Sequence, residues 1–152
     1  MSYTFGSDEY YMHLALQEAR QAENDGEVPV GAVVVSNNKI IAKAYNQTER
    51  LNDATAHAEI LALTSAFNNL GAKYLPDCTL FVTLEPCTMC AGALYWSQIG
   101  RVVIGARDEK RGYLRLKTDL EPIVHPKTEV KFGVLEESCS AIVVKFFANL
   151  RK

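Results

Sequence analysis

The order of apolar patterns along the chain constrains its fold more than any other sequence feature. Residues 28–46 contain two β-rich runs about a Ser-Asn-Asn turn, which is a hairpin signal. After this hairpin, helical and β-rich segments alternate to the end of the chain. Strands that alternate with helices form a sheet with helices packed on both faces. The pattern therefore predicts an α/β fold of three layers, α/β/α, around a five-stranded mixed sheet.

The same pattern predicts where each element lies. Ser7 is a capping residue for a first helix that ends near Gly26. Pro86 suits the first position of a later helix, because its missing N–H costs nothing there. We interpret residues 107–127 as a loop. The other expected helices are residues 56–69 and 135–150, and the expected strands are the two runs of the hairpin and residues 78–83, 101–106 and 128–133.

The length and organisation of the chain indicate one domain. Its 152 residues are close to the most common size of a single domain, and 48% of them are hydrophobic. The sequence has no linker, internal repeat or low-complexity run. We therefore expect residues 1–152 to form a single domain around one core.

Charge and the N-terminal sequence narrow the range of partners and compartments. A net charge of -2 does not favour sequence-independent binding of nucleic acids, although a local basic patch can bind a particular one. The N-terminus lacks the features of a signal peptide, and no segment approaches the roughly 18 apolar residues that cross a bilayer. We therefore expect a cytoplasmic protein without a membrane partner, whose four cysteines are reduced.

Cys87 and Cys90 form a CxxC pair at the start of an expected helix. Their spacing places both sulfurs on one face, and the positive end of the helix dipole favours their thiolate forms. A reduced CxxC pair binds metal or performs redox chemistry more often than it forms a structural disulfide. Two buried core cysteines are the third possibility, and the pair alone does not decide among the three.

His57 and Glu59 lie two residues apart at another expected helix start. Such a pair shares a role only in the first turn, with a metal just beyond the helix end. Together with the cysteines they complete H-x-E…P-C-x-x-C, which is the signature of zinc deaminases. Three protein ligands leave the fourth tetrahedral position open to water, as in a catalytic zinc site. Glu59 is then the proton shuttle, and a helix cap is its alternative role.

Four longer stretches resemble the bacterial tRNA-specific adenosine deaminases of the cytidine deaminase-like superfamily. The similarity is nearly continuous from Glu27 to Gly112. It implies a cytidine deaminase-like fold, one zinc per subunit, a homodimer, and conversion of the anticodon wobble adenosine to inosine. The stretches are EVPVGAVVV, YNQTERLNDATAHAEILAL, CTLFVTLEPCTMCAGAL and IGRVVIGARDEKRG.

The resemblance also assigns roles to single residues. Asn46 matches the asparagine that hydrogen-bonds the target base, although an asparagine after a strand is often a turn residue. Asp108 and Lys110 fall in the family's RNA-contacting loop, and a solvated loop is the alternative. Glu59 matches the proton shuttle, and the zinc ligands match His57, Cys87 and Cys90.

The sequence departs from the family pattern at two places. Tyr95 and Trp96 stand where less aromatic residues are expected, and they fit either a dimer interface or the core. After Gly112 the sequence also differs, and basic residues crowd beside Tyr113, whose ring offers a stacking face for single-stranded RNA. A solvated charged loop is the alternative. The basic residues are Arg107, Lys110, Arg111, Arg115 and Lys117.

The preferred function is zinc-dependent hydrolytic deamination of wobble adenosine in a tRNA anticodon loop. One alternative is a guanine or other free nucleobase or nucleoside deaminase, because such enzymes can carry Tyr-Trp after the cysteine motif. A second alternative is a non-enzymatic binding subunit that zinc only stiffens. Glu59 and the missing fourth ligand count against that subunit, because structural zinc sites are closed.

Overall fold

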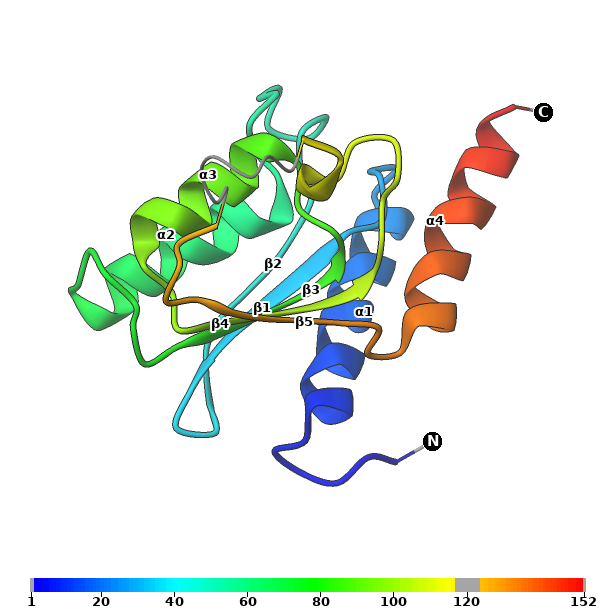
Figure 1. Cartoon of the computed structure of the whole chain (residues 1–152). Helices are drawn as coiled ribbons and strands as arrows, with labels where there is room; N and C mark the ends of the chain where they lie inside the picture. Colours follow the sequence, from blue (N-terminus) through cyan, green and yellow to red (C-terminus); the bar gives the residue numbers. More distant parts are fainter. Residues whose placement is uncertain (1, 117–123, 152) are drawn as a thin grey trace.

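A computed structural model describes residues 2–116 and 124–151 of the chain (Figure 1). The helices and strands follow the order that the sequence predicts. One 3-10 helix, η1, lies within the segment that was expected to be a loop. The elements are α1 (Asp8–Asn24), β1 (Gly31–Ser36), β2 (Lys39–Tyr45), α2 (Ala58–Leu70), β3 (Thr79–Leu84), α3 (Thr88–Ser97), β4 (Arg101–Ala106), η1 (Tyr113–Leu116), β5 (Glu129–Phe132) and α4 (Glu136–Leu150).

The strands form one mixed sheet in the order β2-β1-β3-β4-β5. β1 is antiparallel to both β2 and β3, whereas β3, β4 and β5 are parallel. The β1–β2 hairpin turns at Asn37 and Asn38, which both have positive φ. A tight turn that matches the twist of its two strands requires this conformation. The expected five-stranded mixed sheet is confirmed.

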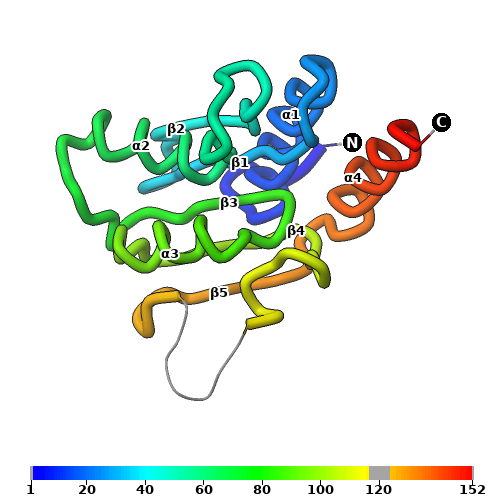
Figure 2. Tube along the Cα trace, turned by 90° about the horizontal axis from the view of Figure 1, so that it is seen from above, coloured from blue at the N-terminus to red at the C-terminus, as the bar shows by residue number. Residues whose placement is uncertain are grey.

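Helices cover both faces of the sheet (Figures 1 and 2): α2 and α3 lie on one face, and α1 and α4 on the other. Successive residues of a strand point to opposite faces. Leu80 and Val82 of β3 therefore join the core beneath α2 and α3, whereas Phe81 joins the core beneath α1 and α4. This arrangement confirms the three-layer α/β/α architecture. That residues 1–152 fold as one independent domain stays a prediction.

The helix ends agree with the sequence at some positions and differ at others. Ser7 caps α1 as expected, since its Oγ accepts a hydrogen bond from the N–H of Tyr10 at 3.1 Å. The expectation that a helix starts at Pro86 was wrong: α3 begins at Thr88, because Cys87 has extended backbone angles and pairs with Gly112 in an isolated β-bridge. Within the described residues, none of the helices combines the length and apolar character that a membrane crossing needs.

The topology gathers several chain segments at one edge of the sheet. The parallel strands β3 and β4 end there, and the N–H of Tyr113, after β4, donates to the carbonyl of Pro86, after β3, at 2.9 Å. β2 ends at the same edge, because Tyr45 pairs with Gly31 at the start of β1. Ligands of open α/β sheets bind outside the carboxyl ends of parallel strands. This edge therefore holds the candidate site.

Candidate active site

The three candidate metal ligands converge from two helix N-termini. His57 is the N-cap of α2, Cys87 is the N-cap of α3, and Cys90 lies in the first turn of α3. The Nδ1 atom of His57 lies 3.6 Å from each of the two cysteine Sγ atoms. All three ligand atoms lie within 4.8 Å of one another. The structure thus brings together the three residues that the sequence predicted as ligands.

The spacing of these atoms fits a tetrahedral zinc ion. Zinc binds sulfur at about 2.3 Å and imidazole nitrogen at about 2.0–2.1 Å, so neighbouring ligands lie about 3.5–3.8 Å apart. The separations between His57 Nδ1 and the sulfurs fall in this range.

The two cysteines shift each other's pKa in opposite directions. A hydrogen bond from Cys90 lowers the pKa of Cys87 to about 4, and His57 lowers it further. The hydrogen bond to Cys87 raises the pKa of Cys90 in turn, since Cys90 keeps the shared proton. The pKa of His57 is also raised by its hydrogen bond with Cys87. A thiolate, a second cysteine sulfur and an imidazole nitrogen at this spacing are suitable ligands for a metal cation.

Glu59 is a buried acid beside this group, with 4% of its surface exposed. Burial raises the pKa of its carboxyl to about 7. A carboxyl with a pKa near neutrality can both accept and donate a proton at physiological pH. α2 begins at Ala58, so Glu59 is its second residue and not the third, which a capping box requires. The position therefore favours proton transfer over helix capping.

Asn46 lies directly after β2 and is buried at the same edge of the sheet. Its Nδ2 donates to the carbonyl of Val28 at 3.2 Å, and its Oδ1 accepts from the N–H of Thr48 at 3.3 Å. These are the bonds of a turn residue, which was the alternative for this position. The amide keeps one further N–H to donate and one further lone pair to accept. Its contact with a base stays a prediction.

Glu27 is a residue at this edge whose role the sequence did not predict. Its carboxylate, buried before β1, accepts the N–H of Glu49 at 3.0 Å and the N–H of Arg50 at 2.7 Å. These bonds fix the loop that follows Asn46. The only sign of this role in the sequence was an acidic residue before an apolar strand, and it does not indicate which groups the carboxylate bonds to.

Asp108 and Lys110 lie in the segment that follows β4, near the same edge. Oδ1 of Asp108 accepts the N–H groups of Lys110 and Arg111, both at 3.1 Å. Asp108 therefore shapes the turn, and the exposed side chain of Lys110 extends from it into solvent. The structure leaves both candidate RNA contacts outside the hydrogen-bonded cluster of ligands.

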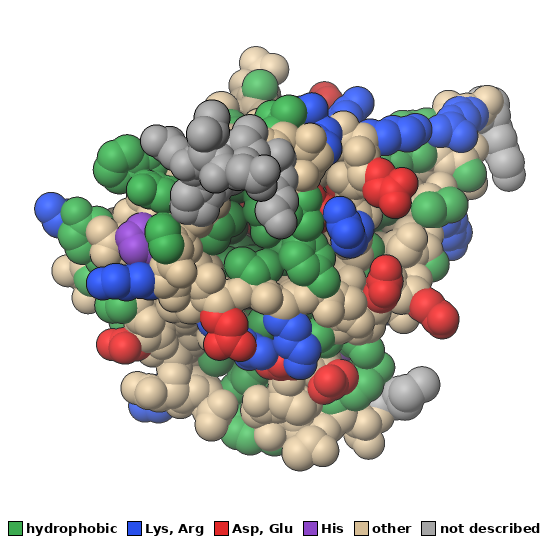
Figure 3. All heavy atoms as spheres, viewed as in Figure 1, with side chains coloured by type: hydrophobic (Ala, Val, Ile, Leu, Met, Phe, Trp, Pro, Cys, Tyr) green, Lys and Arg blue, Asp and Glu red, His purple; other side chains and the backbone are tan. Residues whose placement is uncertain are grey.

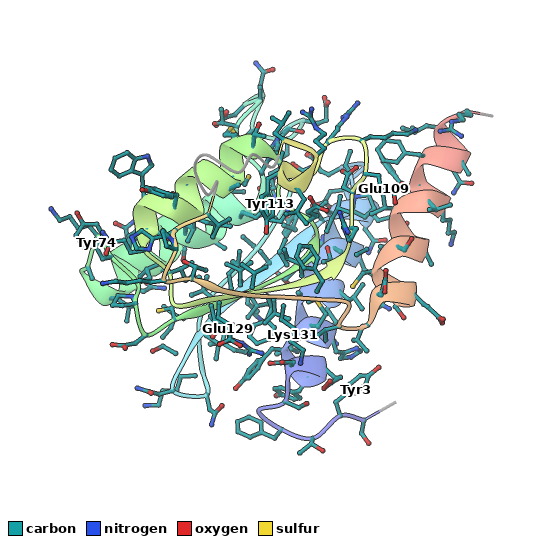
Figure 4. The ribbon with its side chains drawn as sticks, viewed as in Figure 1. Tyr3, Tyr74, Glu109, Tyr113, Glu129 and Lys131 are labelled. Carbon is teal, nitrogen blue, oxygen red and sulfur yellow. The ribbon has the colours of Figure 1, made fainter. Side chains whose placement is uncertain are left out.

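The proposed stacking role of Tyr113 was wrong. The side chain lies beneath η1 and packs with the core on the α2 and α3 face (Figure 4). Burial also raises the pKa of its hydroxyl to about 12. The 3-10 turn directs the ring inward, so its faces are not available to a base. Arg107, Arg111 and Arg115 are exposed as expected, and Lys117 lies outside the described residues.

On a three-layer α/β/α fold, a His-Cys-Cys ligand set beside a buried glutamate defines the class of zinc-dependent hydrolytic deaminases. The model of the cytidine and deoxycytidylate deaminase zinc-binding region matches residues 6–106. The chain belongs to this family, and within it to the tRNA-specific adenosine deaminases. It is an enzyme, and its cofactor is zinc.

Two similar proteins support membership of the tRNA-specific adenosine deaminases. The tRNA-specific adenosine deaminase of Bacillus subtilis is 47% identical over 147 residues, which cover 95% of this chain and 91% of that protein. A solved tRNA:A34 deaminase, studied for A-to-I editing at the wobble position, is 43% identical with a TM-score of 0.81. The match covers 87% of this chain and 97% of that one.

A guanine deaminase has nearly the same fold. The enzyme of Nitrosomonas europaea has a TM-score of 0.80 over 96% of this chain and 87% of that chain, but it is only 26% identical. Backbone similarity therefore does not separate the two substrate classes. Sequence identity differs between them, since it is higher to the tRNA-specific deaminases than to the guanine deaminase.

Proposed function

We propose that this enzyme converts the wobble adenosine of a tRNA anticodon to inosine. The observation that carries the proposal is the contrast in identity between two groups with the same fold. Identity is 47% to the tRNA-specific deaminase of Bacillus subtilis and 26% to the guanine deaminase. A substrate contact depends on side chains and not on the backbone fold, so the similar side chains support the tRNA substrate.

In this proposal Glu59 moves the protons of the reaction. When held by His57, Cys87 and Cys90, zinc would lower the pKa of a bound water from about 15.7 to about 7. Glu59 would take one proton from the water and deliver it to the ring nitrogen N1 of adenine. The same carboxylate would then pass the second proton of the water to the exocyclic amine, so that the C6–N bond breaks, ammonia leaves and the water oxygen stays on C6 of inosine. The burial and raised pKa of Glu59 suit both directions of transfer.

The target base must leave its stack to reach the buried site. We propose that Asn46 hydrogen-bonds this base with the remaining capacity of its amide. Asp108 and Lys110 then contact the flanking nucleotides from the segment after β4. Figure 3 shows Lys and Arg side chains gathered from η1 toward the end of α4, above this edge of the sheet. These charges attract phosphates locally, although the whole chain is slightly acidic.

We also propose a homodimer, with the α2 and α3 side of the molecule at the interface. Trp96 on α3 is 75% exposed, and its ring lies edge-on to that of Tyr95, with the ring centroids 5.7 Å apart. Exposed aromatic side chains are typical of protein interfaces. Trp96 is therefore available to a second copy and is not a core residue. We further propose a cytoplasmic location, because the proposed substrate is a tRNA.

One experiment separates this function from guanine deamination. The zinc-loaded enzyme is given an arginine-tRNA anticodon stem-loop with wobble adenosine in one reaction and free guanine in another, and ammonia release is measured in both. We expect inosine and ammonia from the stem-loop and no turnover of guanine. Rapid guanine turnover without inosine in any tRNA would favour the free-base alternative. The non-enzymatic alternative does not agree with the family or with the buried acid Glu59.

A further inference from the structure

Glu85 is a buried acid without a part in the reaction described above. It follows β3 and directly precedes Pro86 and the ligand Cys87. Its side chain is only 1% exposed, and a carboxylate at such a position requires hydrogen bonds or an ion pair. Among the described residues, all groups that bond or pair with the Glu85 carboxylate belong to the segment after β4.

The two carboxylate oxygens hold opposite ends of that segment. Oε1 accepts the N–H of Asp108 at 3.1 Å, and Oε2 accepts the N–H of Leu114 at 3.0 Å. The Nε atom of the exposed Arg107 lies 3.6 Å from Oε1 and balances the carboxylate charge from the solvent side. Residues 107–114 are therefore anchored at both ends by one side chain.

The segment also lies directly against Glu85 and the start of α3. A Cβ atom added at Gly112 would collide with the Glu85 carboxylate. Gly112 pairs with Cys87 in a β-bridge, and its N–H donates to the carbonyl of Asp108 at 2.8 Å. Only glycine allows this close approach. The turn that carries Lys110 is thus fixed against the same backbone that carries a metal ligand.

We propose that Glu85 is a positioning residue that fixes residues 107–114 beside Cys87 and so sets the RNA contacts of Asp108 and Lys110. Its carboxylate accepts backbone N–H groups and therefore acts through the shape of the segment and not through contact with substrate. The RNA contacts rest on the proposed function, whereas the anchoring of the segment does not.

The first test is the Glu85→Gln variant, which keeps the size of the side chain but loses one acceptor. The amide NH2 group then faces a backbone N–H, so one end of the segment is released. We expect normal zinc content, a KM for the wobble-adenosine stem-loop raised about tenfold and a kcat within about threefold of wild type. In the Lys110→Ala background the same change should raise KM by no more than about twofold, because the two residues act on one contact.

The second test measures the anchoring without any substrate. Amide hydrogen exchange should be at least about tenfold faster across residues 107–114 in Glu85→Gln than in wild type, because exchange reports local opening. Asp8→Asn is the control for a general loss of stability. It removes an ion pair with Arg101 at the start of β4, the opposite end of the strand from the site, and should leave KM and exchange in this segment unchanged.

A third variant covers the case in which Glu85→Gln does not fold. Gly112→Ala keeps the carboxylate and displaces the segment from the other side, and it should raise KM in the same way. The proposal is overturned if Glu85→Gln folds with unchanged KM and unchanged exchange, if kcat falls as much as kcat/KM, or if neither variant folds. A wild-type enzyme inactive on the stem-loop would instead refute the proposed function, and hydrogen exchange would still decide the anchoring.

Discussion

The Nδ1 atom of His57 lies 3.6 Å from the Sγ atom of Cys87, although the two residues are 30 positions apart in the chain. Each residue is the N-cap of its own helix, α2 for the histidine and α3 for the cysteine. The positive ends of two helices thus meet at the same place, which favours the thiolate form of Cys87. The metal site is consequently a junction between two helices.

Zinc binding should depend on this junction. Metal analysis of the purified protein should give about one zinc per chain, and the Cys87→Ala variant should lose both zinc and thermal stability, because zinc binding is coupled to folding. The matched control is Cys78→Ala, which removes a buried cysteine that lies outside the ligand cluster. Full zinc content in a Cys87→Ala, Cys90→Ala double variant would refute the site.

The role of Glu59 can be separated from metal binding. Glu59→Gln keeps the size of the side chain but cannot shuttle a proton. We expect near-normal zinc content and folding, with kcat reduced by at least about 10²–10⁴-fold. The exposed Glu137 on α4 supplies the control variant Glu137→Gln, which should have wild-type turnover. Turnover near wild type in Glu59→Gln would show that another group moves the proton.

Binding of RNA should depend on local charge. The double variant Lys110→Ala, Arg111→Ala should weaken stem-loop binding and reduce the slope of log K against log salt by about 1.4, because each phosphate contact on a single strand contributes about 0.7. Zinc content should not change. Lys39→Ala with Lys43→Ala removes the same charge from exposed positions on β2 and serves as the control. Equal salt slopes in the two double variants would place the RNA elsewhere.

The dimer has a direct test in solution. Light scattering at micromolar concentration should give twice the chain mass of 16.9 kDa. Trp96→Ala should shift the protein toward monomer, because aromatic anchors contribute most of the binding energy at an interface. Val144→Ala, at an exposed position on α4, should leave the mass unchanged. A wild-type monomer at this concentration would contradict the homodimer.

Acid should weaken the ion pair at the opposite end of the molecule from the metal site. Hydrogen bonds from Arg101, at 2.7 Å to each oxygen, lower the pKa of Asp8 to about 2, and Lys131 lowers it further. The folded-state pKa lies below the unfolded value of 3.8, so the stabilisation is complete above about pH 4 and is lost as the pH falls toward 2.

The variant Asp8→Asn tests this dependence. In urea unfolding we expect the free energy of unfolding of wild type to exceed that of the variant by about 1 kcal/mol at pH 7. This value is discounted for the partial exposure of the ion pair. The difference should decrease between pH 4 and pH 2. Loss of zinc in acid affects both proteins equally and cancels in the comparison. A difference that is constant across this range would show that the charge of Asp8 does not contribute.

Part of this site was predictable because its information is local in the sequence. His57 with Glu59, and Cys87 with Cys90, each lie within one helical turn, so their spacing alone places them on a shared helix start. The alternation of strands and helices likewise predicted the three layers. The architecture therefore follows from periodicity, whereas the ligand set also required the match to the zinc-deaminase signature.

Other features depend on contacts that leave no pattern in the sequence. Glu27 and Glu85 are buried because their oxygens accept backbone N–H groups 22 to 29 residues away, and every residue except proline offers such a group. The sequence also suggested an exposed ring for Tyr113. The backbone bonds of Gly112 to Asp108 and of Tyr113 to Pro86 instead hold this segment so that the ring lies in the core.

The sequence by itself determined the type of fold of this protein and predicted its candidate metal ligands and its candidate proton-transferring acid, because the fold follows from periodicity and the candidates from a signature of residues at fixed spacing. Only the tertiary structure decided how β3 and β4, running in parallel, bring the segment of Asp108 and Lys110 against the start of α3. It also decided which acids are buried to fix the loops around the site. The burial of these acids depends on backbone N–H groups from distant segments. Only the folded sheet brings those groups within hydrogen-bonding distance of the carboxylates.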